Sequence, residues 1–188
     1  MNSPDAAPQI TGRTVEFETP WFKLISKTLT GMPGKSEEQT YYSVKPDDYV
    51  TTVASDKEGR LLLVRQYRPA VEDYTLELPA GHVEKNESPE DAAIRELYEE
   101  TGHRPGSVDL LGVLIPDTGR MSNRMWCYFV QNAVPTDKAA DAEEGVSLIL
   151  CPSGDLKEHI LGSRFNHSLH LSALMLAVVK GKLPALAA

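Results

Sequence analysis

Three glutamates, Glu96, Glu99 and Glu100, have the spacing in this chain that points most directly to chemistry. In an α-helix, positions i, i+3 and i+4 share a face, so the three carboxylates would stand close together. Carboxylates this close repel one another unless a cation lies between them. Hard oxygen ligands in this arrangement suit Mg²⁺ or Mn²⁺, so the sequence predicts a divalent metal site. The alternative is a solvated acidic helix face.

The residues around these glutamates carry the signals of a helix with defined ends. Ser88 followed by Pro89 predicts the start, because serine caps free N–H groups and proline fits the first turn. Asp91 stands three residues after Ser88, where it can return the cap. Gly102 stands where helices commonly end in a left-handed residue. We therefore expect a helix from about Pro89 to Thr101.

The stretch from Gly81 to His103 resembles the signature of the Nudix hydrolases, G-x5-E-x7-R-E-U-x-E-E-x-G-U. Its seven fixed non-aliphatic positions would match by chance on the order of once in 10⁸ to 10⁹ start points. Only the last position departs, since His103 stands where that family usually has an aliphatic residue. The matching residues are Gly81, Glu87, Arg95, Glu96, Leu97, Glu99, Glu100 and Gly102.

This resemblance implies a role for each charged residue of the stretch. Glu87 and Arg95 would form an ion pair that orients the helix carboxylates, although a plain structural salt bridge fits the same two residues. Glu96 and Glu100 would be the main metal ligands, and Glu99 would join or support them. The expected metal ligands are the carbonyl of Ala80 and the carboxylates of Glu96, Glu99 and Glu100.

The preceding run, from Val64 to Gly81, resembles the strand, loop and strand of ADP-ribose and nucleoside-diphosphate-sugar pyrophosphatases. That resemblance implies hydrolysis of the pyrophosphate bond of a nucleoside-diphosphate sugar, giving a nucleoside monophosphate and a sugar phosphate. Arg68 stands where such enzymes bind the substrate's phosphates, and we expect Arg65 to contact substrate too. The alternative for Arg68 is a surface arginine at a strand end.

The substrate within this class stays open. ADP-ribose pyrophosphatases typically carry a proline at the position of Thr118, whereas Pro116 falls two residues earlier, so the class is a better expectation than ADP-ribose itself. Two alternative functions are a Nudix domain that senses nucleotide sugars without hydrolysing them and a nucleoside triphosphate pyrophosphatase. The intact carboxylates favour an enzyme over a sensor, and the N-terminal extension argues against the triphosphatase.

Two further parts of the site are expected outside the signature. The general base of this branch is often a glutamate on the loop before a late strand, and that loop here holds Glu143 and Glu144. We favour Glu144 over Glu143, with solvated loop acids as the alternative. His167 and His170 are spaced i, i+3, and without an apparent third ligand we expect a helix-surface pair and not a metal site.

The chain is expected to contain an N-terminal β-sheet region (1–46) and a Nudix hydrolase domain (47–188). Residues 1–10 should be a loose tail, followed by three strands that are too few to be stable alone. They must pack on the rest of the chain or on a second subunit, and the resemblance implies exchange across a homodimer. Trp21 could stack on a nucleobase there, or anchor a core instead.

Strands and helices alternate over residues 47–188 in a way that suits an α/β/α sandwich with a mixed sheet, which the resemblance also implies. The most apolar stretch, Leu171 to Val179, is too short to span a bilayer, and the N-terminus lacks the features of a signal peptide. The two cysteines, Cys127 and Cys151, lack metal-ligand spacing and predict free thiols in a reducing compartment. We therefore expect a cytoplasmic enzyme without a membrane partner.

The net charge of −8 over 188 residues leaves no broad basic surface for nucleic acid. An acidic enzyme that acts on an anionic pyrophosphate must supply positive charge locally. Metal ions and a few arginines are the available sources, so the expected cofactor is Mg²⁺, with Mn²⁺ as the alternative. The expected partner is a small-molecule nucleoside-diphosphate sugar.

Overall fold

The computed structural model describes residues 7–137 and 145–183, and the chain forms two compact units. The smaller unit comprises residues 1–47 and 115–124, and the larger unit comprises residues 48–114 and 125–188. The smaller unit therefore draws on two separate parts of the sequence.

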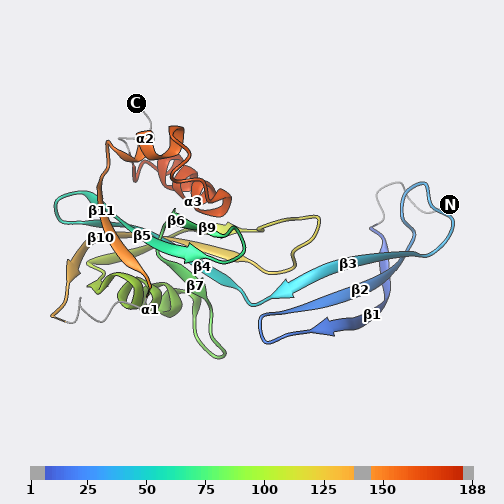
Figure 1. Cartoon of the computed structure of the whole chain (residues 1–188). Helices are drawn as coiled ribbons and strands as arrows, with labels where there is room; N and C mark the ends of the chain where they lie inside the picture. The colour runs from blue at the N-terminus through green and yellow to red at the C-terminus, as the bar shows by residue number, and fades with distance from the viewer. Residues whose placement is uncertain (1–6, 138–144, 184–188) are drawn as a thin grey trace. The chain divides into compact units, whose positions relative to one another are not determined.

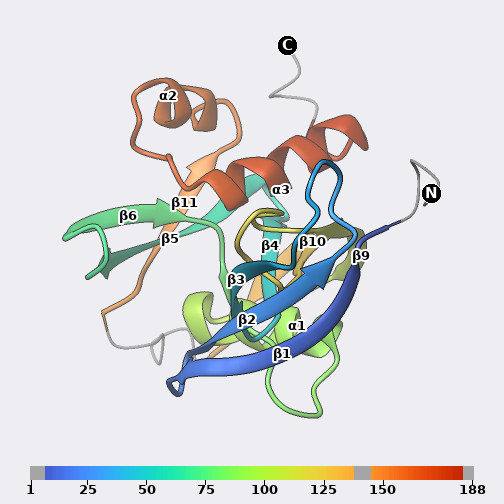
Figure 2. The same ribbon diagram turned by 90° about the vertical axis from the view of Figure 1, so that its right-hand side faces the viewer.

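The smaller unit is built on a three-stranded antiparallel sheet in the order β1-β2-β3 (Figure 2). These strands are β1 (Gln9–Glu18), β2 (Phe22–Thr30) and β3 (Gln39–Pro46). The expectation of a loose tail through residue 10 was wrong at its end, because Gln9 already pairs with Thr30. The segment 115–124 joins this sheet: the Val44 N–H donates to the Arg120 carbonyl at 2.8 Å, and the Ser122 N–H donates to the Val44 carbonyl at 3.0 Å.

The larger unit contains a mixed sheet whose main path is β11-β5-β4-β10-β8, with β6 on β5, β7 on β4 and β9 on β10. Its central pair, β4 and β10, is parallel, with Tyr49 opposite Met125. The strands are β4 (Tyr49–Asp56), β5 (Arg60–Arg68), β6 (Asp73–Glu77), β7 (Ala80–His82), β8 (His103–Arg104), β9 (Ser107–Leu114), β10 (Met125–Pro135) and β11 (Ser147–Pro152). The helices are α1 (Pro89–Thr101), α2 (Leu156–Leu161) and α3 (Ser168–Val179).

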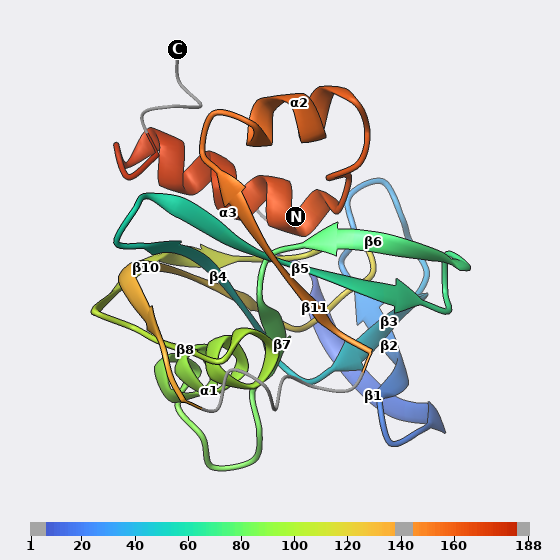
Figure 3. The ribbon, with the colours of Figure 1, turned by 60° about the vertical axis from the view of Figure 1, so that its left-hand side comes forward.

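Helices cover both faces of this sheet, with α1 on one face and α2 and α3 on the other (Figures 1 and 3). The expected α/β/α sandwich with a mixed sheet and a small additional antiparallel sheet is thereby confirmed. None of the described helices has both the length and the apolar composition needed to cross a membrane.

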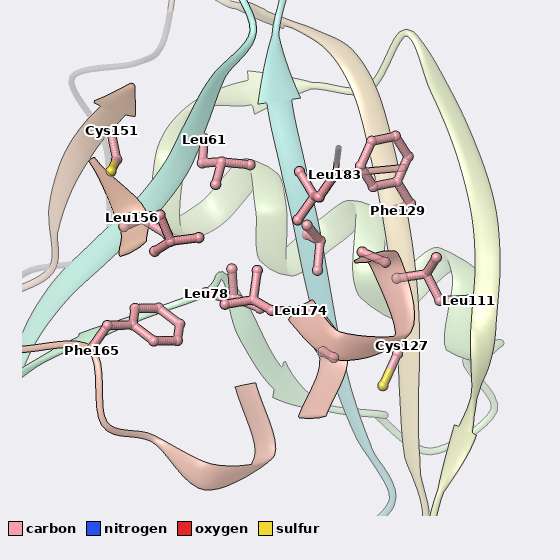
Figure 4. Close-up of a cluster of buried hydrophobic side chains, with 14 of the residues drawn as sticks. Leu61, Leu78, Leu111, Cys127, Phe129, Cys151, Leu156, Phe165, Leu174 and Leu183 are labelled. Carbon is pink, nitrogen blue, oxygen red and sulfur yellow. The ribbon is translucent and has the colours of Figure 1, made fainter. Parts of the chain in front are cut away.

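Alternation along β5 divides the core between the two faces. Leu61 and Leu63 pack in the cluster that also holds Leu174 of α3, whereas Leu62 packs with Leu97 of α1. Figure 4 shows the first cluster, which also contains Cys127 and Cys151 as buried free thiols. Burial raises the pKa of the Cys127 thiol to about 12, so it behaves as a small apolar side chain there.

Helix α1 has the ends that its sequence predicts. The Ser88 hydroxyl accepts a hydrogen bond from the Asp91 N–H at 3.1 Å, and Gly102 closes the helix with φ of 68°. The expected return cap takes another form, because the Asp91 carboxylate accepts from the Ser88 hydroxyl at 2.6 Å and not from a backbone N–H. Fixed ends and buried Leu97 together set which face of α1 carries the glutamates.

Candidate metal and substrate site

Glu100 is the most buried of the three helix glutamates, with 3% of its surface exposed. Its Oε2 accepts a hydrogen bond from the Ala80 N–H at 2.9 Å, which ties α1 to the start of β7. Glu96 lies directly over Gly81, where an added Cβ would collide with the Glu96 carboxylate. The first glycine of the signature is therefore required by close approach of a side chain to the backbone.

Arg95 joins the remaining acids of the signature. Its Nη1 donates to Glu96 Oε1 and to Glu99 Oε2, both at 2.9 Å. Its Nε and Nη2 donate to the two oxygens of Glu87, also at 2.9 Å each. The hydrogen bonds from Arg95 lower the pKa of Glu87, so this carboxylate remains charged and holds the guanidinium in place. One arginine thus positions two of the expected metal ligands.

The donor set fits a hard divalent cation. Three carboxylates, those of Glu87, Glu96 and Glu99, pair with the single guanidinium of Arg95. Glu100, held by the Ala80 N–H, adds a fourth, so negative charge remains in surplus. Carboxylate oxygens and a backbone carbonyl are the ligands that Mg²⁺ and Mn²⁺ prefer. The absence of a Cβ on Gly81 leaves the space that the Glu96 carboxylate occupies.

Arg68 binds a buried carboxylate that the sequence analysis missed. Its Nε and Nη2 donate to the two oxygens of Glu77 at 2.8 and 2.7 Å, and the Thr75 hydroxyl donates to Glu77 at 2.5 Å. Burial alone would raise the pKa of Glu77, but the hydrogen bonds from Arg68 and Thr75 outweigh it and lower the pKa to about 2. In the described part of the chain, Nη1 of Arg68 has no hydrogen-bond acceptor.

A cavity of about 830 Å³ opens beside this ion pair. It lies between the β5–β6 hairpin, β11 and the connection from α2 to α3, segments that Figure 3 shows on one side of the larger unit. Arg65 lines it with its guanidinium 3.9 Å from the centre of the Tyr74 ring, a cation–π contact. Arg68 and Arg164 supply two more guanidinium groups to the lining. The cavity therefore suits an anionic or strongly polar ligand.

His167 at the N-cap of α3 and His170 in its first turn are not the surface pair that we expected. His170 is fully buried and His167 is half-buried, with their ring centroids 3.9 Å apart. Burial lowers the pKa of His170 to about 3, so its ring is neutral. The sequence did contain a signal for this burial. His170 belongs to the apolar helix α3, and a histidine on the buried stripe of such a helix must face the interior.

Three other predictions have different outcomes. Glu143 and Glu144 lie outside the described residues, so the general base stays a prediction. Trp21 belongs to the smaller unit, where 72% of its surface is exposed, so the alternative of a core anchor was wrong. His103 replaces the usual aliphatic residue yet is buried, and its Nδ1 donates to the Thr101 carbonyl at 2.7 Å.

Comparison with known proteins places this fold and this carboxylate cluster in one family. A model described as the NUDIX domain matches residues 45–167, and the chain belongs to the Nudix family. The crystal structure of an ADP compounds hydrolase superimposes with a TM-score of 0.78 at 25% identity, covering 96% of this chain and 100% of that one.

Curated relatives match over shorter stretches. An ADP-ribose pyrophosphatase of Bacillus subtilis is 45% identical over 60 residues, which are 32% of each protein. A methanol dehydrogenase activator of Bacillus methanolicus is 31% identical over 121 residues, which are 63% of this chain and 65% of that protein. The chain thus spans less than two thirds of the length of either relative.

Proposed function

We propose that this chain hydrolyses the pyrophosphate bond of nucleoside-diphosphate sugars, with a divalent metal ion, to a nucleoside monophosphate and a sugar phosphate. The observation that carries the proposal is the intact carboxylate set: Glu100 is fixed on the Ala80 N–H, and Arg95 holds Glu96 and Glu99. The similarity to an ADP-ribose pyrophosphatase and to an ADP compounds hydrolase supports the substrate class.

In this proposal, Mg²⁺ is held by the carboxylates of Glu96, Glu99 and Glu100 and by the Ala80 carbonyl, with Mn²⁺ as a substitute. When bound, the ion neutralises the diphosphate and makes water a better nucleophile. The protein contributes preorganisation, because Glu100 cannot swing away from Ala80 without losing a buried hydrogen bond. Arg95 keeps two carboxylates together that would otherwise repel each other.

The cavity beside Arg68 is the proposed place for the sugar-phosphate half of the substrate. Its volume of about 830 Å³ falls in the range of small-molecule sites. Arg68 offers the N–H groups of Nη1, while Arg65 and Arg164 line the same space. The proposed general base is Glu144, or else Glu143, in the segment of the sequence that precedes β11.

The homodimer, the cytoplasmic location and the division into residues 1–46 and 47–188 are parts of the same proposal. The smaller unit exposes several large apolar side chains, which supports a partner surface on its sheet. These exposed side chains are Ile10, Val15, Phe17, Trp21, Phe22, Tyr41 and Tyr42.

A substrate panel tests the proposed reaction. Purified protein with Mg²⁺ should release nucleoside monophosphate from at least one of ADP-ribose, ADP-glucose, GDP-mannose and UDP-glucose, and release less from nucleoside triphosphates. If calorimetry shows tight binding of these compounds but no product forms, the chain is a sensing domain and not an enzyme. Preferential cleavage of triphosphates would move the chain to the triphosphate pyrophosphatases.

A further inference from the structure

Both ring nitrogens of His170 have a hydrogen-bond partner in the interior of the larger unit. Nδ1 lies 3.1 Å from the backbone nitrogen of Leu78, and Nε2 lies 2.8 Å from the hydroxyl oxygen of Tyr49. The Tyr49 and His170 rings are nearly parallel, with an interplanar angle of 3°, and the His167 ring stacks on the His170 ring with the two centroids 3.9 Å apart. The imidazole is therefore fixed in position and in orientation.

These contacts determine where the hydrogens lie. A backbone N–H can only donate, so Nδ1 of His170 must be the acceptor from Leu78. The proton of the neutral ring is then on Nε2, which donates to the Tyr49 oxygen. Because the Tyr49 oxygen accepts from His170, its own hydrogen must point in another direction.

The Tyr49 hydroxyl lies near the Arg68–Glu77 ion pair, because its oxygen is 2.8 Å from Nε2 of His170 and a ring nitrogen of His170 lies within 4.8 Å of a Glu77 oxygen. Tyr49 begins β4 opposite His82 of β7, two positions from the pair that Thr51 makes with Ala80. Burial and then the negative charge of Glu77, with a further contribution from Glu100, raise the pKa of the Tyr49 hydroxyl well above its ordinary value. It stays a phenol, and within residues 7–137 and 145–183 no acceptor is recorded for its proton.

We propose that the Tyr49 hydroxyl donates a hydrogen bond to the diphosphate group of the substrate, and that His170 is the positioning residue that holds it in the donating orientation. This inference rests on the proposed hydrolysis and adds a substrate contact to it. A preorganised donor of this kind stabilises negative charge that builds on the phosphate oxygens in the transition state. His170 also fixes the Leu78 N–H, two residues before Ala80.

A metal ion bound by Glu77, His167 and His170 is the rival explanation of this cluster, since one ligand atom from each lies within 4.8 Å of the others. The hydrogen bonds argue against it. Both oxygens of Glu77 already accept from Arg68, and the Nδ1 lone pair of His170 already accepts from Leu78. A metal on Nε2 would have to displace both the proton and Tyr49.

Tyr49→Phe is the central variant, because it removes one hydroxyl and keeps the ring. On the best substrate of the panel with Mg²⁺, we expect kcat to fall about 10²-fold, with a smaller change in KM. Tyr128→Phe is the matched control: Tyr128 is also buried in the larger unit, on β10, and should keep the wild-type kcat. Thermal unfolding of each variant separates lost folding from lost chemistry.

A double-mutant cycle tests the role of His170. His170→Leu should lower kcat in the wild-type background and add little in the Tyr49→Phe background, because His170 acts through the Tyr49 hydroxyl. His170→Gln retains an N–H donor and should recover part of the rate. If the leucine variant does not fold, the glutamine variant takes its place in the cycle, and its partial loss of kcat should vanish in the Tyr49→Phe background.

Several outcomes would overturn the inference. An active wild type whose Tyr49→Phe variant has the same kcat removes Tyr49 as a donor and leaves the proposed function standing. If His170→Leu lowers kcat equally in the wild-type and the Tyr49→Phe background, His170 does not act through the Tyr49 hydroxyl. Stoichiometric Zn²⁺ binding that is lost in His170→Leu supports the rival metal site. A wild type inactive on every substrate overturns the proposed function and this inference together.

Discussion

Glu100 and Ala80 are joined by a buried hydrogen bond, from the Ala80 N–H to Glu100 Oε2 at 2.9 Å. It connects the last turn of α1 to the first residue of β7, so one contact aligns a proposed carboxylate ligand with a proposed carbonyl ligand. The geometry of the proposed metal site thus depends on the packing of one helix against one short strand.

The variant Glu100→Gln should separate charge from structure at this contact. The amide oxygen can still accept from Ala80, so the fold should be retained, whereas the metal loses an anionic ligand. We expect kcat to fall by about 10² or more, measured with saturating Mg²⁺. Glu90→Gln, in the exposed first turn of the same helix, is the control and should leave kcat unchanged. An active Glu100→Gln enzyme would remove Glu100 from the metal site.

Gly81→Ala should impair turnover more than stability. The new methyl group would collide with the Glu96 carboxylate, which can move only by leaving its position beside Arg95. Displacement of a proposed ligand by about 1 Å is expected to lower kcat about 10²-fold. Gly154→Ala is the matched control, because an added Cβ there meets nothing within 4 Å. Equal activity of the two variants would contradict the role of the Gly81 approach.

The ion pair of Arg68 and Glu77 should make the free energy of unfolding depend on pH. The pKa of Glu77 is lowered from 4.5 to about 2 in the folded protein, so the stabilisation is fully present above pH 4.5. It is lost as the pH falls from there through about 2, because the unfolded chain binds the proton first. Urea unfolding of wild type and Glu77→Gln should show a stability difference that narrows over this interval. A difference independent of pH would show that the pair does not stabilise the fold.

Arg164→Ala should weaken substrate binding with little effect on the chemical step. Its guanidinium lines the proposed sugar-phosphate cavity together with Arg65 and Arg68. A hydrogen bond to a charged group contributes about 1.5 kcal/mol or more, so we expect KM to rise about tenfold at nearly constant kcat. Arg104→Ala, at the exposed position of β8, is the control of equal charge change. A fall in kcat with unchanged KM would contradict this prediction and assign Arg164 to the chemical step.

Local signals explain what could be predicted from the sequence. Ser88 and Gly102 act on their own helix ends, and the spacing of the glutamates acts within two turns of α1, so its bounds and its acidic face were predictable. The pairing of Tyr49 with His170 was not, because those residues are 121 positions apart and meet only when α3 packs on β4.

Two other contacts were hidden for similar reasons. Glu77 lies in a strand where sequence patterns favour an exposed acid, and its hydrogen bonds from Arg68 and Thr75 make burial possible. The segment 115–124 joins the smaller unit through backbone hydrogen bonds to Val44. Such bonds do not depend on side-chain type, so the sequence pattern could not predict them.

Phosphorus NMR of ADP-ribose or the best substrate of the panel, incubated with the protein and Mg²⁺, tests the central claim most directly. The proposed reaction predicts that the two pyrophosphate resonances disappear and are replaced by two monophosphate resonances, from the nucleoside monophosphate and the sugar phosphate. The conversion should stop with EDTA and be greatly slowed in Glu100→Gln. Pyrophosphate resonances that persist for every substrate at high protein concentration would contradict the account.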